Sequence, residues 1–319
     1  MLTLGYASWK IILEHMDANR RLNLSYKCPK IRSICKLTPL KIGHISLGSC
    51  GSITMNKATY EFWMILRMFA DRKRILVQNM DVYGDINTSP DGKINYPLPM
   101  MPGSLHLKYM AIQKNVGNVL QVIENSLGQN AIEKLELNES TDFTHPIIQS
   151  ADALILTGFR EARCLLRTEN SRVHGNFNQD FDRDEARNLI EDWKNKKYDI
   201  GRYYTVEVPG HTKIKAILED LKTINGAEIK EIEEIKHTDF PEYITFPMTW
   251  TAELNVYCLS NFSPNDPMAV YPVHKGFVFI VHFVINSRGY AKKLEPVKTE
   301  DLDTELSEEE MELFDEESD

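Results

Sequence analysis

The chain has 319 residues, of which 42% are hydrophobic and 26% are charged, values typical of a globular protein that folds in water. No apolar run reaches the roughly 18–20 residues that a membrane-spanning helix needs, and Lys10, Glu14 and His15 interrupt the apolar stretch of a possible secretory signal. Five cysteines without a CxxC pair fit reduced thiols better than a disulfide framework. These features predict an intracellular protein, in the cytoplasm, the nucleus or both.

The net charge of −9 is concentrated at the C-terminus. Twelve acidic residues and no basic residue lie between Glu300 and Asp319, whereas the rest of the chain carries 37 basic and 34 acidic residues. The densest basic cluster is the short run Arg72-Lys73-Arg74, which does not suggest a nucleic-acid surface. We therefore expect a nearly neutral folded body, no nucleic-acid or membrane partner, and a disordered acidic tail over residues 295–319.

The first segment, residues 1–39, is predicted to be helical. Apolar residues recur there at a spacing that places them on one face of a helix. They are Tyr6, Trp9, Ile12, Leu13 and Met16. Asp17 fits the N-cap of a second helix that Pro29 ends, and a third short turn is expected before Pro39.

Residues 40–103 are predicted to form a β-hairpin region. The segments KIGHISLGS and SITMNKATYEF alternate apolar and polar residues, with Gly48 and Gly51 between them. Residues 85–103 are rich in Pro, Gly, Asn and Asp, which predicts a loop or a second small hairpin and a first internal boundary.

Strand-like and helix-like segments alternate over residues 104–294. The strand-like segments are 104–110, 132–138, 151–158, 172–178 and 203–208. Helices are expected around Val116–Leu127, near 183–197 and at 212–224. The alternation fits either a degenerate leucine-rich-repeat-like solenoid with parallel strands on one face or a non-repetitive α/β sheet.

Two further strands are expected near the end of this segment. They are WTAELNVYCLS and GFVFIVHFVIN, and the second is almost continuously apolar, as a central strand would be. The predicted fold class is therefore α+β/α/β: a helical segment at 1–39, a β-hairpin region at 40–103, strand–helix units and C-terminal β-strands at 104–294, and the tail at 295–319.

One acidic segment has the spacing of a calcium-binding loop. Asp180, Asp182, Asp184 and Glu191 occupy the first, third, fifth and twelfth positions of an EF-hand. However, Glu185 stands where the sharp turn needs glycine, and the apolar residues that follow continue in helical register. The acidic residues are therefore predicted to cap a helix rather than to bind calcium.

A cysteine offers the second candidate for chemistry. Cys50 lies in the turn GSCGS with His44 nearby in the sequence, but a catalytic cysteine also needs a base held by a third group. The other cysteines and the histidines lack the spacing of a metal site. We expect no catalytic, cofactor or metal site, and an unrecognised hydrolase that uses Cys50 or the Asp180–Glu191 cluster is the minor alternative.

The acidic tail contains one candidate regulatory residue. Ser307 is followed by Glu308, Glu309 and Glu310, a sequence that suits an acidophilic kinase. The alternative is that the tail only increases solubility.

Several short motifs near the N-terminus carry a resemblance to a known family. They are Ile11-Ile12-Leu13-Glu14-His15-Met16, Ala18-Asn19-Arg20-Arg21, Cys28-Pro29, Pro39-Leu40-Lys41-Ile42, and Ile53-Thr54-Met55-Asn56 followed by Tyr60. With these motifs, residues 4–70 resemble the divergent F-box-like opening of a nematode-expanded F-box C family, whose shared domain has no assigned function. A weaker likeness to F-box-associated domains extends over residues 100–225. Leu4-Gly5-Tyr6 replaces the Leu-Pro pair that usually opens an F-box, and the later tryptophan-containing helix is not evident.

The resemblance implies a non-catalytic substrate-recognition subunit of an SCF-type ubiquitin ligase. Its helices would bind the adaptor subunit of the ligase, and the rest of the chain would hold an unknown protein substrate. The residues expected to bind the adaptor are Tyr6, Trp9, Ile12, Leu13 and Met16, whose spacing suits helix-in-groove docking. Two alternatives stay open: an interaction module that no longer binds the adaptor, and side chains that only cap the following sheet.

Overall fold

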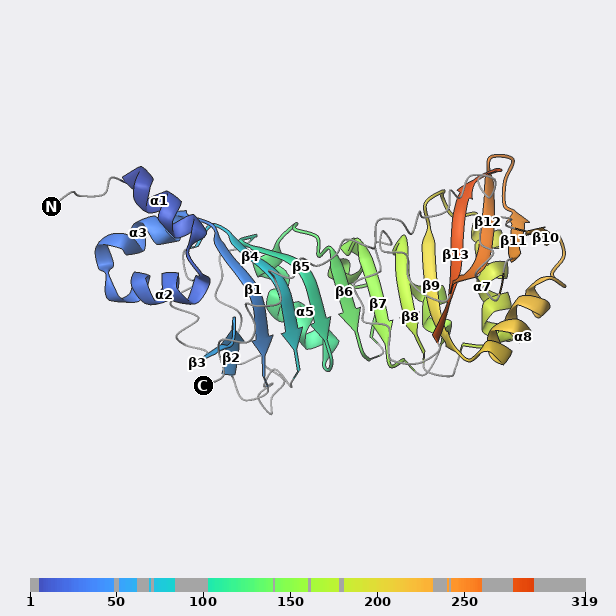
Figure 1. The fold of residues 1–319 in the computed structure, drawn as a ribbon, viewed down its shortest axis with the longest axis horizontal. Coiled ribbons are helices and arrows are strands. Elements are labelled where there is room, and N and C mark those ends of the chain that lie inside the picture. Colours follow the sequence, from blue (N-terminus) through green and yellow to red (C-terminus); the bar gives the residue numbers. More distant parts are fainter. Residues whose placement is uncertain are drawn as a thin grey trace, which may run out of the picture.

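The computed structural model describes residues 6–48, 52–61, 69, 72–83, 103–139, 141–159, 162–177, 181–231, 240, 242–259 and 278–289. Its strands form one 13-stranded sheet in the order β10-β11-β12-β13-β9-β8-β7-β6-β5-β4-β1-β2-β3 (Figure 1). None of the helices among the described residues is long and apolar enough to cross a bilayer.

Three short helices precede the sheet, as the sequence predicts. They are α1 (Tyr6–His15), α2 (Ala18–Lys27) and α3 (Pro29–Leu37). The Asp17 carboxylate caps α2 by accepting hydrogen bonds from the backbone N–H groups of Asn19 (2.9 Å) and Arg20 (3.3 Å). Pro29 has no N–H to continue α2 and instead occupies the first turn of α3, so the third element is a full helix rather than a short turn.

The expected antiparallel pair follows as β1 (Leu40–Leu47) and β2 (Ser52–Met55). A tight turn at Asn56 and Lys57, which both have positive φ, then leads into β3 (Ala58–Glu61). The sequence did not predict β4 (Ile75–Val82), which pairs in parallel with β1. Its buried residues are Ile75, Val77, Met80 and Val82, and its two neighbours in the sheet, β1 and β5, lie far from it in the sequence.

The middle of the sheet is parallel and follows chain order. It comprises β1, β4, β5 (Leu105–Ile112), β6 (Lys134–Leu137), β7 (Ala153–Thr157), β8 (Arg172–Asn176) and β9 (Tyr203–Pro209). The five strands expected over residues 104–208 are all present. The helical elements between and after them are α5 (Val116–Leu127), α6 (Pro146–Ser150), the 3-10 helix η1 (Ala162–Arg167), α7 (Arg183–Lys196) and α8 (His211–Leu221).

The C-terminal part of the sheet is antiparallel. It consists of β10 (Glu228–Glu231), β11 (Glu242–Pro247), β12 (Ala252–Leu259) and β13 (Val278–Ser287). β13 lies between β9 and β12 and is antiparallel to both, which confirms the prediction of a central apolar strand. Because β13 is antiparallel to β9, its end lies at the edge where the parallel strands begin.

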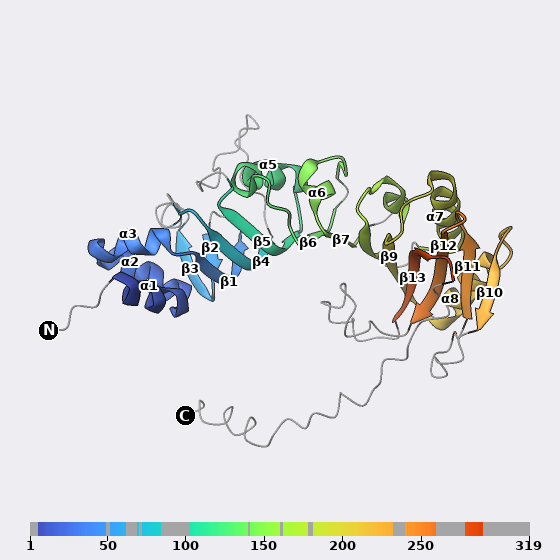
Figure 2. The same cartoon turned by 90° about the horizontal axis from the view of Figure 1, so that it is seen from above.

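One large hydrophobic core runs along the sheet, from Ala18 near the N-terminus to Ile285 in β13. It includes residues of the strands and of the helices that pack on them; α5 lies behind the strands in Figure 1, and Figure 2 shows α5, α6 and α7 on one side of the sheet. The sheet and the core continue without a break from β4 to β5, across the boundary expected near residue 103. On the opposite face of the parallel strands, called here the helix-free face, the described residues include a small apolar cluster around Ala153 and Ile155.

Candidate interaction surfaces

The five apolar residues predicted to bind a partner do not share one exposed face of α1. Leu13 is fully buried and forms a small cluster with Ile31 and Cys35 of α3, against which Trp9 and Met16 are partly buried. Tyr6 and Ile12 are exposed, at 57% and 38%. Leu13 therefore holds α1 against α3 rather than against the following sheet.

Three apolar side chains of α1 remain exposed and are called here the α1 patch, and at about 3.6 residues per turn they point in different directions around the helix. The patch consists of Tyr6, Ile11 and Ile12, and Ile11 is 60% exposed. The spacing argument missed Ile11 because it followed the face that includes Leu13. Exposed apolar side chains are a common feature of partner-binding sites.

Two buried arginines connect the three helices to the sheet. Arg21 of α2 donates hydrogen bonds to the carbonyl oxygens of Cys35 (2.8 Å), Pro39 (2.6 Å) and Thr38. Arg72, just before β4, donates to the same Cys35 oxygen at 2.6 Å. Burial, and secondarily the nearby positive charge of Arg21, lowers the pKa of Arg72 to about 10. Within the cluster 72–74, Arg72 is thus structural, and it fixes α3 against the strands.

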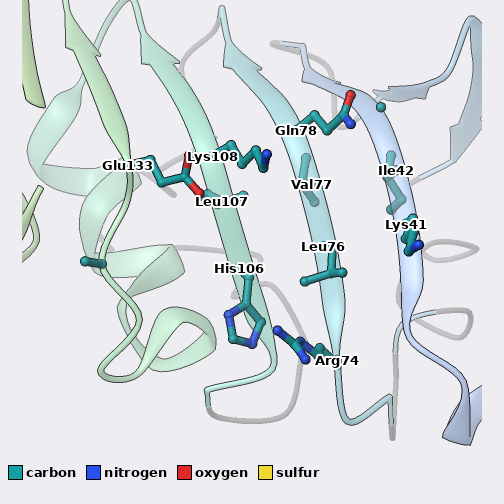
Figure 3. Close-up of a pocket in the computed structure, with 12 residues that line it drawn as sticks. Lys41, Ile42, Arg74, Leu76, Val77, Gln78, His106, Leu107, Lys108 and Glu133 are labelled. Atoms are coloured by element: carbon teal, nitrogen blue, oxygen red, sulfur yellow. The ribbon is translucent and has the colours of Figure 1, made fainter. Parts of the chain in front are cut away.

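A groove of about 570 Å³ opens on the helix-free face near the beginning of β1, β4 and β5 (Figure 3). The strand register places Leu76 of β4 between Lys41 of β1 and His106 of β5. Figure 3 shows Arg74 beside His106 at one end of the groove, with Lys108 farther along β5. The groove therefore combines an apolar side chain with surrounding basic groups.

The groove is electrostatically positive. Glu133 is the carboxylate among its lining residues, whereas Lys41, Arg74 and Lys108 are basic. These three basic side chains form no ion pair or hydrogen bond with any residue that the structure describes. Burial, followed by the positive charge of Arg74, lowers the pKa of His106. The positive charge of the groove therefore comes from Lys41, Arg74 and Lys108 rather than from a protonated His106.

A buried polar network lies on the helix-free face over β8 and β9. His174 Nδ1 is 2.9 Å from Thr205 Oγ1, and His174 Nε2 is 3.3 Å from Glu207 Oε1. The Asn176 amide also donates to Glu207, at 2.5 Å. A hydroxyl, an imidazole and a carboxylate in this order resemble a hydrolase triad. Thr205 is 0% exposed, however, and none of the three residues lines either of the two grooves described here.

Aromatic rings continue this face toward the antiparallel strands. The His282 ring stacks on Tyr257 (centroids 4.6 Å apart), and Tyr257 stacks on Tyr243 (4.5 Å). Burial, and then the charge of nearby His174, lowers the pKa of His282 to about 3. Nδ1 of the neutral ring lies 2.7 Å from the Tyr203 hydroxyl oxygen, within hydrogen-bond distance. The row of rings thus extends over β9, β13, β12 and β11.

A second hollow, of about 800 Å³, lies where β7, β8 and β9 begin. Two of its residues serve the fold: Asn170 donates to the carbonyl oxygens of Ile148 (2.7 Å) and Ala151 (3.0 Å), and Arg202 lies over the Tyr198 ring at 3.6 Å. Because its rim carries both acidic and basic residues, the hollow has no clear preference for a ligand charge.

The residues considered for metal binding and catalysis have structural roles where they are described. Asp182 caps α7 by accepting from the backbone N–H groups of Asp184 (2.9 Å) and Glu185 (3.1 Å), which confirms the predicted cap. No group of three His, Cys, Asp or Glu side chains within the described ranges could hold a metal ion. Cys50, Asp180 and Ser307 lie outside those ranges, so their proposed roles stay predictions.

The structure thus defines a mixed α/β protein with two candidate interaction surfaces, the α1 patch and the helix-free face. Residues 64–210 match the sequence model of a family described as "Domain of unknown function (DUF3557)". The match confirms a domain of unknown function that extends from before β4 to the end of β9. It includes only the last part of residues 4–70, so the F-box resemblance stays a prediction. No curated protein and no solved structure matches the chain.

Proposed function

We propose that the chain is a non-catalytic substrate-recognition subunit of an SCF-type ubiquitin ligase, located inside the cell. In this proposal the α1–α3 segment binds the adaptor subunit, and the helix-free face holds the substrate protein. The observation that supports adaptor binding by the α1–α3 segment is the exposure of the α1 patch. Tyr6, Ile11 and Ile12 remain exposed on a helix that Leu13 already packs against α3.

The energetic argument favours a partner for these side chains. Full burial of a large aliphatic side chain contributes about 1.5–3 kcal/mol, and Ile11 is still 60% exposed. A few such residues at the centre of an interface typically provide most of its affinity. Since Leu13 is committed to the helical cluster, Ile11 takes its place in the proposed adaptor-binding set, with Trp9 and Met16 at the edge.

The proposal that the helix-free face holds the substrate protein also interprets the strand–helix units as leucine-rich-repeat-like. Strands β1, β4 and β5 share one spacing of buried residues. The triplets that begin it are Leu40-Ile42-Ile45, Ile75-Val77-Met80 and Leu105-Leu107-Met110. The strands also follow chain order with helices on one face, as in solenoid proteins, which use the strand face to bind partners.

The alternative is an interaction module of the same family that no longer binds the adaptor. Two observations favour it: the Leu-Pro opening is absent, and Leu13 is unavailable to a partner. Under this alternative the helix-free face still binds a protein, whereas α1 does not.

A pull-down with purified adaptor subunit separates the two. The wild-type full chain should retain the adaptor, and Ile11→Asp/Ile12→Asp should reduce the retained amount at least tenfold. Tyr26→Asp is the matched control, because Tyr26 is 62% exposed on α2, outside the α1 patch. Failure of the wild-type chain to retain the adaptor would support the alternative. Leu13→Asp is not a suitable variant, since it would disrupt the cluster that holds α1.

A further inference from the structure

The groove of Figure 3 has three basic side chains without a partner in the described part of the chain. We infer that this groove binds the chain's own acidic tail, residues 300–319, in an intramolecular contact. The tail lies outside the described residues, so the inference rests on the geometry of the groove and on the sequence of the tail. It does not depend on whether α1 binds the ligase adaptor.

The chemistry of the two segments is complementary. Lys41, Arg74 and Lys108 surround Leu76 in the groove, and the tail has 12 acidic residues and no basic one. Apolar residues stand among the tail carboxylates. They are Leu302, Leu306, Met311, Leu313 and Phe314. A single exposed ion pair contributes little, so a groove with several separated cations selects a ligand that presents several anions along one segment.

The last described strand, β13, ends at the edge of the sheet where the groove opens. Gly201, just before β9, donates its N–H to the carbonyl oxygen of Ile285 at 2.9 Å, and Val284 pairs with Tyr203. The end of β13 therefore lies at the edge where the parallel strands begin. The groove opens at the beginning of β4 and β5, which is the same edge.

The length of the connection is also sufficient. Five strands separate β13 from β4, and neighbouring strands are about 4.8 Å apart, so the two lie about 29 Å apart along the sheet. The segment from Gly289 to Glu300 can extend about 36 Å at about 3.3 Å per residue. The first tail carboxylates can therefore reach the groove. A connection of about ten residues also gives the tail a millimolar effective concentration, which compensates for the weakness of each ion pair.

Zero-length carbodiimide cross-linking of the full chain, followed by mass spectrometry, tests the inference directly, because it joins only amines and carboxylates in direct contact. We expect cross-links from Lys41 and Lys108 to tail carboxylates in the monomer fraction, with a yield independent of protein concentration. Arg74→Glu keeps both lysines but reverses one charge of the groove, and it should reduce these cross-links at least fivefold. Lys108→Glu should cause the same loss at Lys41.

The control is Lys215→Glu, which makes the same change of net charge on an exposed position of α8 and should leave the yield within twofold. Arg74 is itself exposed, so its replacement should not disturb folding. The inference is overturned if Lys41 and Lys108 form no cross-link to the tail, if the cross-links appear only between two copies, or if Arg74→Glu leaves them unchanged. A failed adaptor pull-down would not affect this result, so the two proposals fail separately.

Discussion

Arg72 Nη1 donates a 2.6 Å hydrogen bond to the carbonyl oxygen of Cys35, and this contact joins the last helix of the N-terminal segment to the first residues before β4. Arg72 is 1% exposed, so the bond to the Cys35 carbonyl is made by a buried guanidinium. A charged donor in such a position orients α3 relative to the sheet and thereby fixes where α1 presents its exposed patch. The placement of the candidate adaptor-binding surface thus depends on a residue far from it.

Replacing Arg72 should therefore destabilise the protein. In Arg72→Met the Cys35 carbonyl loses a charge-assisted donor, and we expect the free energy of unfolding to fall by about 2 kcal/mol. Denaturant unfolding followed by circular dichroism measures this change. Lys73→Met is the matched control, because Lys73 is exposed, and its effect should stay within about 0.5 kcal/mol. Equal effects of the two changes would contradict the structural role of Arg72.

Leu13 and Ile11 should respond differently to the same truncation. Leu13→Ala removes a fully buried side chain from the cluster with Ile31 and Cys35 and should cost about 2–4 kcal/mol of local stability. Ile11→Ala removes an exposed side chain and should cost less than about 0.5 kcal/mol. Hydrogen exchange of the α1 amides is the appropriate measurement. Faster exchange in both variants would show that Ile11 also holds the helix in place.

Buried His282 should make stability depend on pH. Its pKa in the folded protein is lowered to about 3, whereas that of an unfolded histidine is about 6.5, so below pH 6.5 the unfolded state binds the additional proton. Stability from this group is complete above about pH 6.5 and falls by up to about 1.4 kcal/mol per pH unit on acidification toward pH 3. Urea unfolding between pH 7 and 4.5 should show that slope, and His282→Gln should reduce it. His15→Gln, on the exposed end of α1, should leave the slope unchanged; an equal reduction in both variants would contradict the assignment.

Gly175 is required in β8 by the packing of Phe177. A Cβ atom at Gly175 would lie 2.1 Å from Cε2 of the fully buried Phe177 ring. Gly175→Ala should therefore lower the free energy of unfolding by about 1–3 kcal/mol, the usual cost of overpacking. At Gly117 in α5 no atom lies within 4 Å of the added Cβ, so Gly117→Ala should be neutral or stabilising by up to about 1 kcal/mol. Thermal unfolding of the two variants compares them, and a neutral Gly175→Ala would show that the ring can move.

Much of the fold was predictable because local signals agreed with the final structure. Asp17 and Asp182 mark helix starts in the sequence, and both carboxylates cap those helices in the structure. β4 and β10 were not predicted, for two physical reasons. β4 pairs in parallel with β1 and β5, which are distant in the chain, and β10, with sequence EIKE, is a mostly charged edge strand that is recognisable only once it pairs with β11.

The candidate surfaces were less predictable than the fold. Helical spacing identified the apolar residues of α1, but which of them α3 covers depends on tertiary packing, so Leu13 was expected at a partner and Ile11 was not. The groove could not be assembled from the sequence, since Lys41, Arg74 and His106 come together only through the register of three parallel strands. One of these strands is β4, which the sequence did not predict.

Hydrogen–deuterium exchange of the full chain, with and without purified adaptor subunit, tests the central claim most directly. If the chain is a substrate-recognition subunit, adaptor binding should slow the exchange of the amides of α1, Tyr6–His15, while those of β10–β13 remain unchanged. Exchange that is the same in both samples, or protection confined to the sheet, would contradict the proposed role of the N-terminal helices.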